Sequence, residues 1–206
     1  EVLSSHDFDA LALRCYEGQL EGAIKGYSNE EKRNNLHQAW DSIPKKLRQQ
    51  ANLVFAYSQR LLDLDAPSEA EEVVSTFLRK DWDDRLVRLY GAIMGKDPNK
   101  QYLLAESWLK ERPSNATLLL TLGRLCLQIR DWEKARQYFD ASVKSRKSAE
   151  AYGELGRLLA RLGEHEASNE SFQCGLTMIA QRLPDLPLPP RAQTAAVSPA
   201  ETIESD

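Results

Sequence analysis

The chain has 206 residues, of which 42% are hydrophobic and 28% are charged, and its formal net charge is −4. This composition is typical of a soluble globular protein that is large enough to bury a core. The sequence has no run rich in lysine and arginine, so it lacks the positive surface that phosphate backbones require, and we expect no nucleic acid partner.

The three cysteines, Cys15, Cys126 and Cys174, are widely spaced and form no CxxC pair. We expect reduced thiols rather than disulfides or zinc ligands, and we expect Cys126 and Cys174 to be buried because both fall on apolar stripes. The longest apolar runs are far shorter than the roughly 18 residues of a membrane-spanning helix. The chain begins at Glu1 without a signal sequence, which predicts that it is part of a longer protein.

Residues 1–50 contain two segments with apolar residues at helical spacing, DFDALALRCYEGQ and EEKRNNLHQAWDSIP. We expect them to form an N-terminal pair of helices, the second of which ends at Pro44. Residues 51–83 show a weak copy of the same arrangement, with Ala70 and Val74 on the apolar stripe of the second helix.

The run DWDD at residues 81–84 could be read as a metal site, but acidic residues between two helical segments are typical of N-caps and turns. Residues 84–115 then carry two further apolar stripes, and Asp97-Pro98 is a start signal for the second helix. Their spacing fits a regular repeat only with an insertion, so we interpret this segment as a divergent unit.

The clearest repeats are residues 116–148 and 149–181. The stretches LGRLCLQIRDWEKARQYF from Leu122 and LGRLLARLGEHEASNESF from Leu155 are identical at 6 of 18 positions. Each predicts two antiparallel helices, in which the glycines let the second helix come close and the phenylalanines fill the wedge between one pair and the next. The residues expected to pack these repeats are Leu122, Gly123, Ala135, Phe139, Leu155, Gly156 and Phe172.

The last segment, residues 183–206, holds five of the nine prolines and almost no large apolar side chain after Leu188. Such a composition cannot bury a core, and we expect this tail to be disordered. The folded region is therefore predicted to be a helical solenoid over residues 1–182.

The two clear repeats resemble the tetratricopeptide repeat. The resemblance rests on Leu119-x-x-Leu122-Gly123-x-x-Cys126 with Ala135-x-x-x-Phe139, and on Tyr152-x-x-Leu155-Gly156-x-x-Leu159 with Ser168-x-x-x-Phe172. Ser168 departs from the pattern by replacing the usual alanine. The resemblance implies an all-α, right-handed superhelical solenoid of antiparallel helix hairpins.

The segments AWDSIPKKLRQQ, RKDWDDRLVRLYG, AESWLKERPSNATLLLTLGRL, DWEKARQYFDAS and AYGELGRLLARLGE together are similar to the C-terminal region of the HemY family of proteobacteria. The likeness covers residues 10–180. It implies two transmembrane helices upstream of Glu1, a location on the cytoplasmic side of the bacterial inner membrane, and a role in the late steps of protohaem formation.

A stacked solenoid has a concave groove lined by the first helix of each hairpin, where extended partners bind. The positions expected to face it are Thr117, Leu120, Arg124, Gln128, Gly153, Arg157 and Arg161. Three arginines that converge there would suit a carboxylate, from an acidic peptide, a chain terminus or a porphyrin propionate. The alternative is that these arginines are solvated and pair with nearby acids such as Glu154.

No metal site and no cofactor are expected, although haem is a possible ligand. Its axial ligands would come from His6, His37, His165 or a cysteine, and we interpret His165 as a surface or packing residue because it takes the place of Trp132 in the neighbouring repeat. The four tryptophans, Trp40, Trp82, Trp108 and Trp132, are interpreted as packing between helices.

The sequence contains no phosphate-binding loop, nucleophile elbow or HExxH motif, so we expect no enzyme activity. Two functions remain. One is a scaffold that binds late haem-pathway enzymes such as ferrochelatase and protoporphyrinogen oxidase through the groove. The alternative is a haem or porphyrin carrier or sensor.

Overall fold

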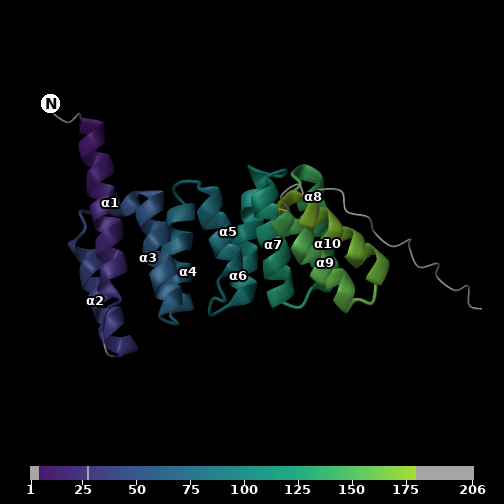
Figure 1. Cartoon of the computed structure of the whole chain (residues 1–206), viewed down its shortest axis with the longest axis horizontal. Coiled ribbons are helices and arrows are strands. Elements are labelled where there is room, and N and C mark those ends of the chain that lie inside the picture. The colour runs from purple at the N-terminus through teal and green to yellow at the C-terminus, as the bar shows by residue number, and fades with distance from the viewer. Residues whose placement is uncertain (1–4, 27, 180–206) are drawn as a thin grey trace, which may run out of the picture.

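The computed structural model describes residues 5–26 and 28–179. Within these residues the chain forms ten α-helices and two short 3-10 helices, which stack as successive hairpins along one axis (Figure 1). The all-α solenoid expected from the sequence is confirmed. The predicted disorder of residues 183–206 lies outside the described residues.

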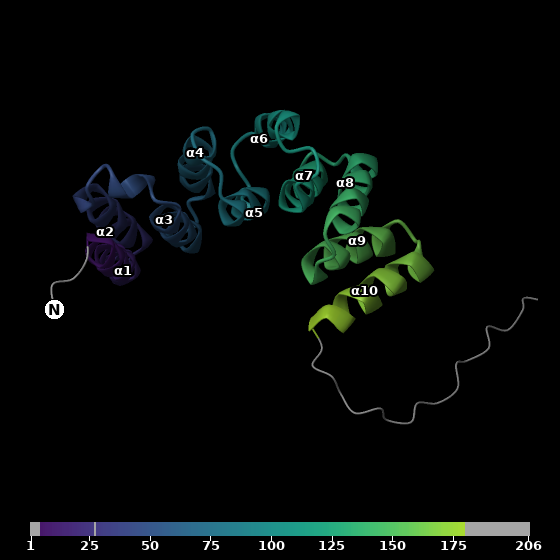
Figure 2. The same ribbon diagram turned by 90° about the horizontal axis from the view of Figure 1, so that it is seen from above.

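One hairpin occupies each segment that the sequence pattern separates. The helices are α1 (Ser5–Ala23) and α2 (Asn29–Ser42), α3 (Ala51–Asp63) and α4 (Pro67–Leu78), α5 (Asp84–Ala92) and α6 (Pro98–Ser107), α7 (Ala116–Gln128) and α8 (Trp132–Ser145), and α9 (Ala149–Arg161) and α10 (His165–Ile179). The 3-10 turns η1 (Leu47–Gln49) and η2 (Trp108–Lys110) precede α3 and follow α6. Seen from above, the hairpins follow an arc, with α1, α3, α5 and α7 on its inner side and α2, α4 and α6 on its outer side (Figure 2).

The divergent unit differs from the regular repeats at the turn of its hairpin. Helix α5 has 9 residues, whereas α7 has 13, and a longer connection leads from α5 to α6. In the other compact turns one residue adopts a positive φ, of 56° at Asp65, 63° at Arg130 and 81° at Gly163. The third hairpin closes without this tight left-handed turn. The insertion expected from the sequence was wrong, because the short α5 offsets the longer connection: α5, α7 and α9 begin at Asp84, Ala116 and Ala149, so the third unit is one residue shorter than the fourth.

Acidic N-caps begin the helices where the sequence placed them. The side chain of Asp83 accepts hydrogen bonds from the backbone N–H groups of Arg85 and Leu86, and the side chain of Asp97 accepts one from Lys100. Hydrogen bonds from the Arg85 guanidinium also hold the pKa of the Asp83 carboxyl below its usual range. The DWDD run therefore caps a helix, as interpreted.

The repeated glycine and phenylalanine set the distance between the helices of a hairpin. A Cβ at Gly123 would collide with the ring of Phe139, and one at Gly156 would collide with Phe172, so both glycines permit the close approach that the pattern predicted. Each ring lies against the glycine of its own hairpin, whereas the sequence pattern placed it between one hairpin and the next. Phe139 is fully buried and Phe172 is 36% exposed.

The remaining packing positions Leu122, Ala135 and Leu155 are buried. Three tryptophans pack between helices as expected, because Trp40 stacks on Tyr57 and Trp82 meets Trp108 edge to face. Trp132 departs from this expectation, since it is 45% exposed.

Cys126 is buried, as expected, whereas Cys174 is exposed and its expected burial was wrong. Helix α10 is the last described element, and within the described residues no further hairpin covers its outer face. None of the helices in this part of the chain is both long and apolar enough to cross a bilayer.

Candidate interaction surface on the last repeats

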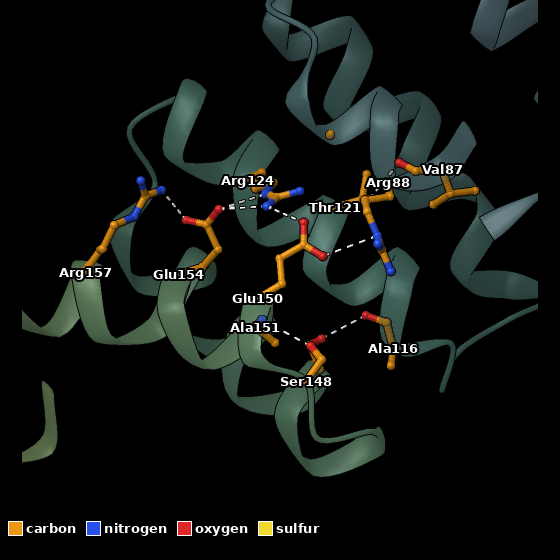
Figure 3. A network of polar contacts seen from close by, with 12 residues as sticks. Val87, Arg88, Ala116, Thr121, Arg124, Ser148, Glu150, Ala151, Glu154 and Arg157 are labelled. Carbon is orange, nitrogen blue, oxygen red and sulfur yellow. Dashed lines mark hydrogen bonds and ion pairs between the residues drawn. The ribbon is translucent and has the colours of Figure 1, made fainter. Parts of the chain in front are cut away.

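A row of alternating charges links the first helices of three successive hairpins (Figure 3). Arg124 on α7 donates from Nε and Nη2 to Oε1 of Glu154 on α9, at 2.9 and 2.8 Å, and from Nη2 to Oε1 of Glu150 at 2.8 Å. Glu150 also pairs with Arg88 on α5 at 3.3 Å, and Glu154 also accepts a hydrogen bond from Arg157. We call these five residues the charge row.

The charge row changes the interpretation of the predicted arginine cluster. Arg124 and Arg157 do come together, but they meet on the carboxylate of Glu154, which is the alternative that the sequence left open. The side chains of Arg124 and Glu154 are only 17% and 11% exposed. Their charges are therefore satisfied inside the chain rather than offered to an external carboxylate.

Three other positions predicted for the groove serve the packing of α7. Thr117 and Leu120 are each 3% exposed, so their assignment as partner-facing residues was wrong. They are buried because α7 contacts neighbouring helices on several sides, as Thr121 illustrates by donating to the carbonyl oxygen of Val87 on α5 at 2.8 Å (Figure 3). Gln128 donates from Nε2 to the carbonyl oxygen of Ile93 at 3.1 Å and so joins α7 to the end of α5.

Arg161, like Arg157, is a predicted groove residue that stays exposed. With Arg157 it borders a pocket of about 610 Å³ at the end of the charge row. The other lining residues are Leu127, Trp132, Glu154, Leu158, Ala160, Leu162 and Phe172. Among the described residues Arg161 has no ion-pair partner, and we call this cavity the Arg161 pocket.

Large apolar side chains remain exposed around the Arg161 pocket. Trp132 and Leu162 are each 45% exposed and Phe172 is 36% exposed. They come from the start of α8, the end of α9 and the middle of α10, so the pocket exists only because two hairpins are stacked. It combines an apolar wall with a guanidinium at its edge.

Sequence reasoning missed Glu150, Arg88, Trp132 and Leu162 as residues of this surface, and it named Glu154 only in the alternative interpretation of the arginines. Glu150 and Glu154 lie four positions apart on one helix and therefore on one face, a signal that could have paired both with Arg124. Arg88 lies in the divergent unit, where no repeat register was available to align it. Trp132 and Leu162 flank hairpin turns, and periodicity alone does not tell whether a neighbouring hairpin covers such positions.

The candidate haem ligands are not gathered at this surface. Nε2 of His37 lies 2.8 Å from the carboxylate of Glu69, and burial raises the pKa of the Cys126 thiol to about 12. Cys15 and His165 are exposed on α1 and at the first residue of α10. In the part of the chain that the structure describes, no three histidine, cysteine or acidic residues are grouped to hold a metal ion. His6 has no described side chain.

Comparison with known proteins agrees with this architecture. The family model of the tetratricopeptide repeat matches residues 103–149 and 120–173, which include α7, α8 and α9. Protein HemY of Escherichia coli (strain K12) and Protein HemY of Shigella flexneri are each 26% identical to the chain over 149 residues. The chain is therefore similar to HemY and contains tetratricopeptide repeats. The match covers 72% of this HemY-like chain and 37% of each relative, so the chain spans well under half of their length.

Solved structures show the same fold at lower sequence identity. MamA (residues 41 to the end) from Desulfovibrio magneticus RS-1 has a TM-score of 0.51 at 16% identity and covers 81% of this HemY-like chain and 94% of its own. PilF of Pseudomonas aeruginosa has a TM-score of 0.54 at 18% identity, with 84% and 79% covered. At these identities the likeness concerns the fold alone.

Proposed function

We propose that this chain is a non-catalytic scaffold that binds late haem-pathway enzymes, among them ferrochelatase and protoporphyrinogen oxidase, on the cytoplasmic side of a bacterial inner membrane. The observation that carries this proposal is the similarity to HemY, which includes the tetratricopeptide repeats. Because the chain corresponds to 37% of the HemY relatives, the proposal concerns the part of the whole protein that this solenoid supplies.

The architecture supports binding of a protein rather than turnover of a substrate. A solenoid of stacked hairpins presents an extended surface on consecutive helices, and partner segments bind along such surfaces. The charge row fixes α5, α7 and α9 relative to one another, so the surface is preorganised before a partner arrives. Holding two consecutive enzymes nearby raises their local concentration and limits the escape of reactive porphyrins.

The proposal is tested by direct binding of purified components. Ferrochelatase and protoporphyrinogen oxidase are each immobilised, and the chain is passed over them in surface plasmon resonance. We expect at least one enzyme to bind the wild type, and we expect Arg161→Glu to weaken this binding. The matched control is Arg14→Glu, which reverses an exposed arginine on α1, far from the Arg161 pocket.

Absence of binding to both enzymes contradicts the proposed haem-pathway partners. Equal binding by the wild type and by Arg161→Glu would support the scaffold function and would show that the enzyme does not bind at the Arg161 pocket. Titration of the chain with haemin tests the carrier alternative in parallel, since a carrier gives a saturable shift of the Soret band. We expect no such shift, because two of the candidate ligands are the paired His37 and the buried Cys126.

A further inference from the structure

We infer that the Arg161 pocket binds an acidic protein segment, which inserts one large apolar side chain between Trp132, Leu162 and Phe172 and places a carboxylate on Arg161. The inference rests on the proposed function as an interaction scaffold and names the chemistry of the segment that it recognises. It also moves the contact from the predicted groove arginines to a pocket that two stacked hairpins build together.

The apolar part of the pocket is the first support. Three large hydrophobic side chains from α8, the end of α9 and α10 remain between 36% and 45% exposed around one cavity of about 610 Å³. Phe139, at the position equivalent to Phe172 one repeat earlier, is fully buried. Cavities of this volume are typical of ligand sites, and exposed apolar side chains gathered at one place indicate an interaction surface.

The positive charge at the edge of the pocket favours an acidic occupant. Two arginines and one glutamate line it, and that glutamate already accepts hydrogen bonds from Arg124 and Arg157. Arg161 is exposed and lacks an acidic partner among the described residues, so the edge of the pocket carries an uncompensated positive charge. A guanidinium beside an apolar wall fits a carboxylate that stands next to a large apolar side chain.

A second copy of the chain fits this pocket poorly. A symmetric contact through it would bring Arg161 of one copy toward Arg161 of the other, and like charges oppose such an approach. The chain's own segment at residues 183–188, LPDLPL, also places leucines around an acid and is the competing occupant. We propose a segment of another protein as the occupant, and the experiment distinguishes it from a second copy and from the chain's own segment.

The test selects peptides from a random library displayed on phage, using the full chain as bait. We expect enriched peptides to carry aspartate or glutamate within one or two positions of leucine, phenylalanine or tryptophan. A synthetic, fluorescently labelled copy of one such peptide is then titrated in fluorescence anisotropy. Arg161→Glu should weaken its binding about tenfold or more. Leu162→Ser should also weaken it, and Arg14→Glu should leave it unchanged. Circular dichroism melting confirms that all variants are folded.

Several results overturn the inference. These are a library without enriched peptides, enriched peptides without acidic residues, and undiminished binding to Arg161→Glu. If the peptide binds only when the chain is truncated after Ile179, the pocket is occupied by the chain's own segment at residues 183–188. If analytical ultracentrifugation shows a dimer and Leu162→Ser dissociates it, the Arg161 pocket binds a second copy of the chain. Binding of the expected peptides without binding of either haem enzyme refutes the proposed partners and leaves the pocket assignment intact.

Discussion

The guanidinium of Arg124 and the carboxylate of Glu154 are joined by two hydrogen bonds across the boundary between consecutive hairpins. Glu154 is 11% exposed and also accepts from Arg157, while Arg124 reaches Glu150 as well. The contact between these two repeats is therefore partly electrostatic, in a fold whose repeats are expected to stack chiefly through apolar side chains.

Arg124→Ala should lower the free energy of unfolding by about 1–3 kcal/mol, because it leaves the largely buried oxygens of Glu154 with fewer donors. Urea denaturation followed by circular dichroism measures the change. The control is Arg88→Ala, whose side chain is 53% exposed and whose loss should cost less than about 1 kcal/mol. Equal effects of the two substitutions would show that burial of the pair contributes nothing.

The two repeat glycines should differ in their response to alanine. Gly123→Ala is expected to cost about 1–3 kcal/mol, because the ring of Phe139 is fully buried and has no room to move away. Gly156→Ala should cost clearly less, because Phe172 is partly exposed and its ring can turn outward. Thermal melting of both variants gives the comparison, and a larger loss at Gly156 contradicts it.

The three cysteine thiols should differ in their reactivity. Cys15 and Cys174 are exposed, whereas Cys126 is buried with its pKa raised to about 12, so at pH 8 it is held as the unreactive thiol. Ellman's reagent should therefore titrate two thiols in the native chain and the third only in guanidinium chloride. Rapid reaction of all three in the native chain would mean that Cys126 is accessible.

The cap of α5 should make stability depend on acid pH. The folded pKa of Asp83 is lowered by its hydrogen bonds with Arg85, so the carboxylate stabilises the fold above its unfolded pKa of about 3.9. This contribution is lost as the pH falls through the lower, folded value. Asp83→Asn keeps a capping oxygen and removes the charge, so it should destabilise the chain at pH 7 and change little near pH 2. The urea midpoints of the wild type and of Asp83→Asn are measured at both pH values. A difference between the two proteins that is the same at pH 7 and near pH 2 would contradict the prediction.

The sequence predicted the hairpins well because each carries its own signals. Asp83 and Asp97 cap helices where they were expected to, and Gly123 and Gly156 lie under the phenylalanines that follow them. These relationships are local, within one hairpin, and a single repeat is enough to recognise them.

The surface was harder to predict because exposure depends on the neighbouring hairpins. Thr117 and Leu120 were expected to face a partner, but the helices around α7 cover them. Cys174 was expected to be buried, but it lies on α10, the last described helix. The arginines were recognised correctly as residues of one face, and the acids that neutralise most of them were mentioned only as an alternative.

The charge row has a mechanical consequence. Its five side chains alternate in sign: Glu150 on α9 bridges Arg88 on α5 and Arg124 on α7, and Glu154 bridges Arg124 and Arg157 of its own helix. A force that bends the arc between these hairpins must separate opposite charges. Dissolved ions screen the more exposed Arg88–Glu150 pair more than the largely buried Arg124–Glu154 pair. Rising ionic strength should therefore loosen the contact between α5 and α9 before the contact between α7 and α9.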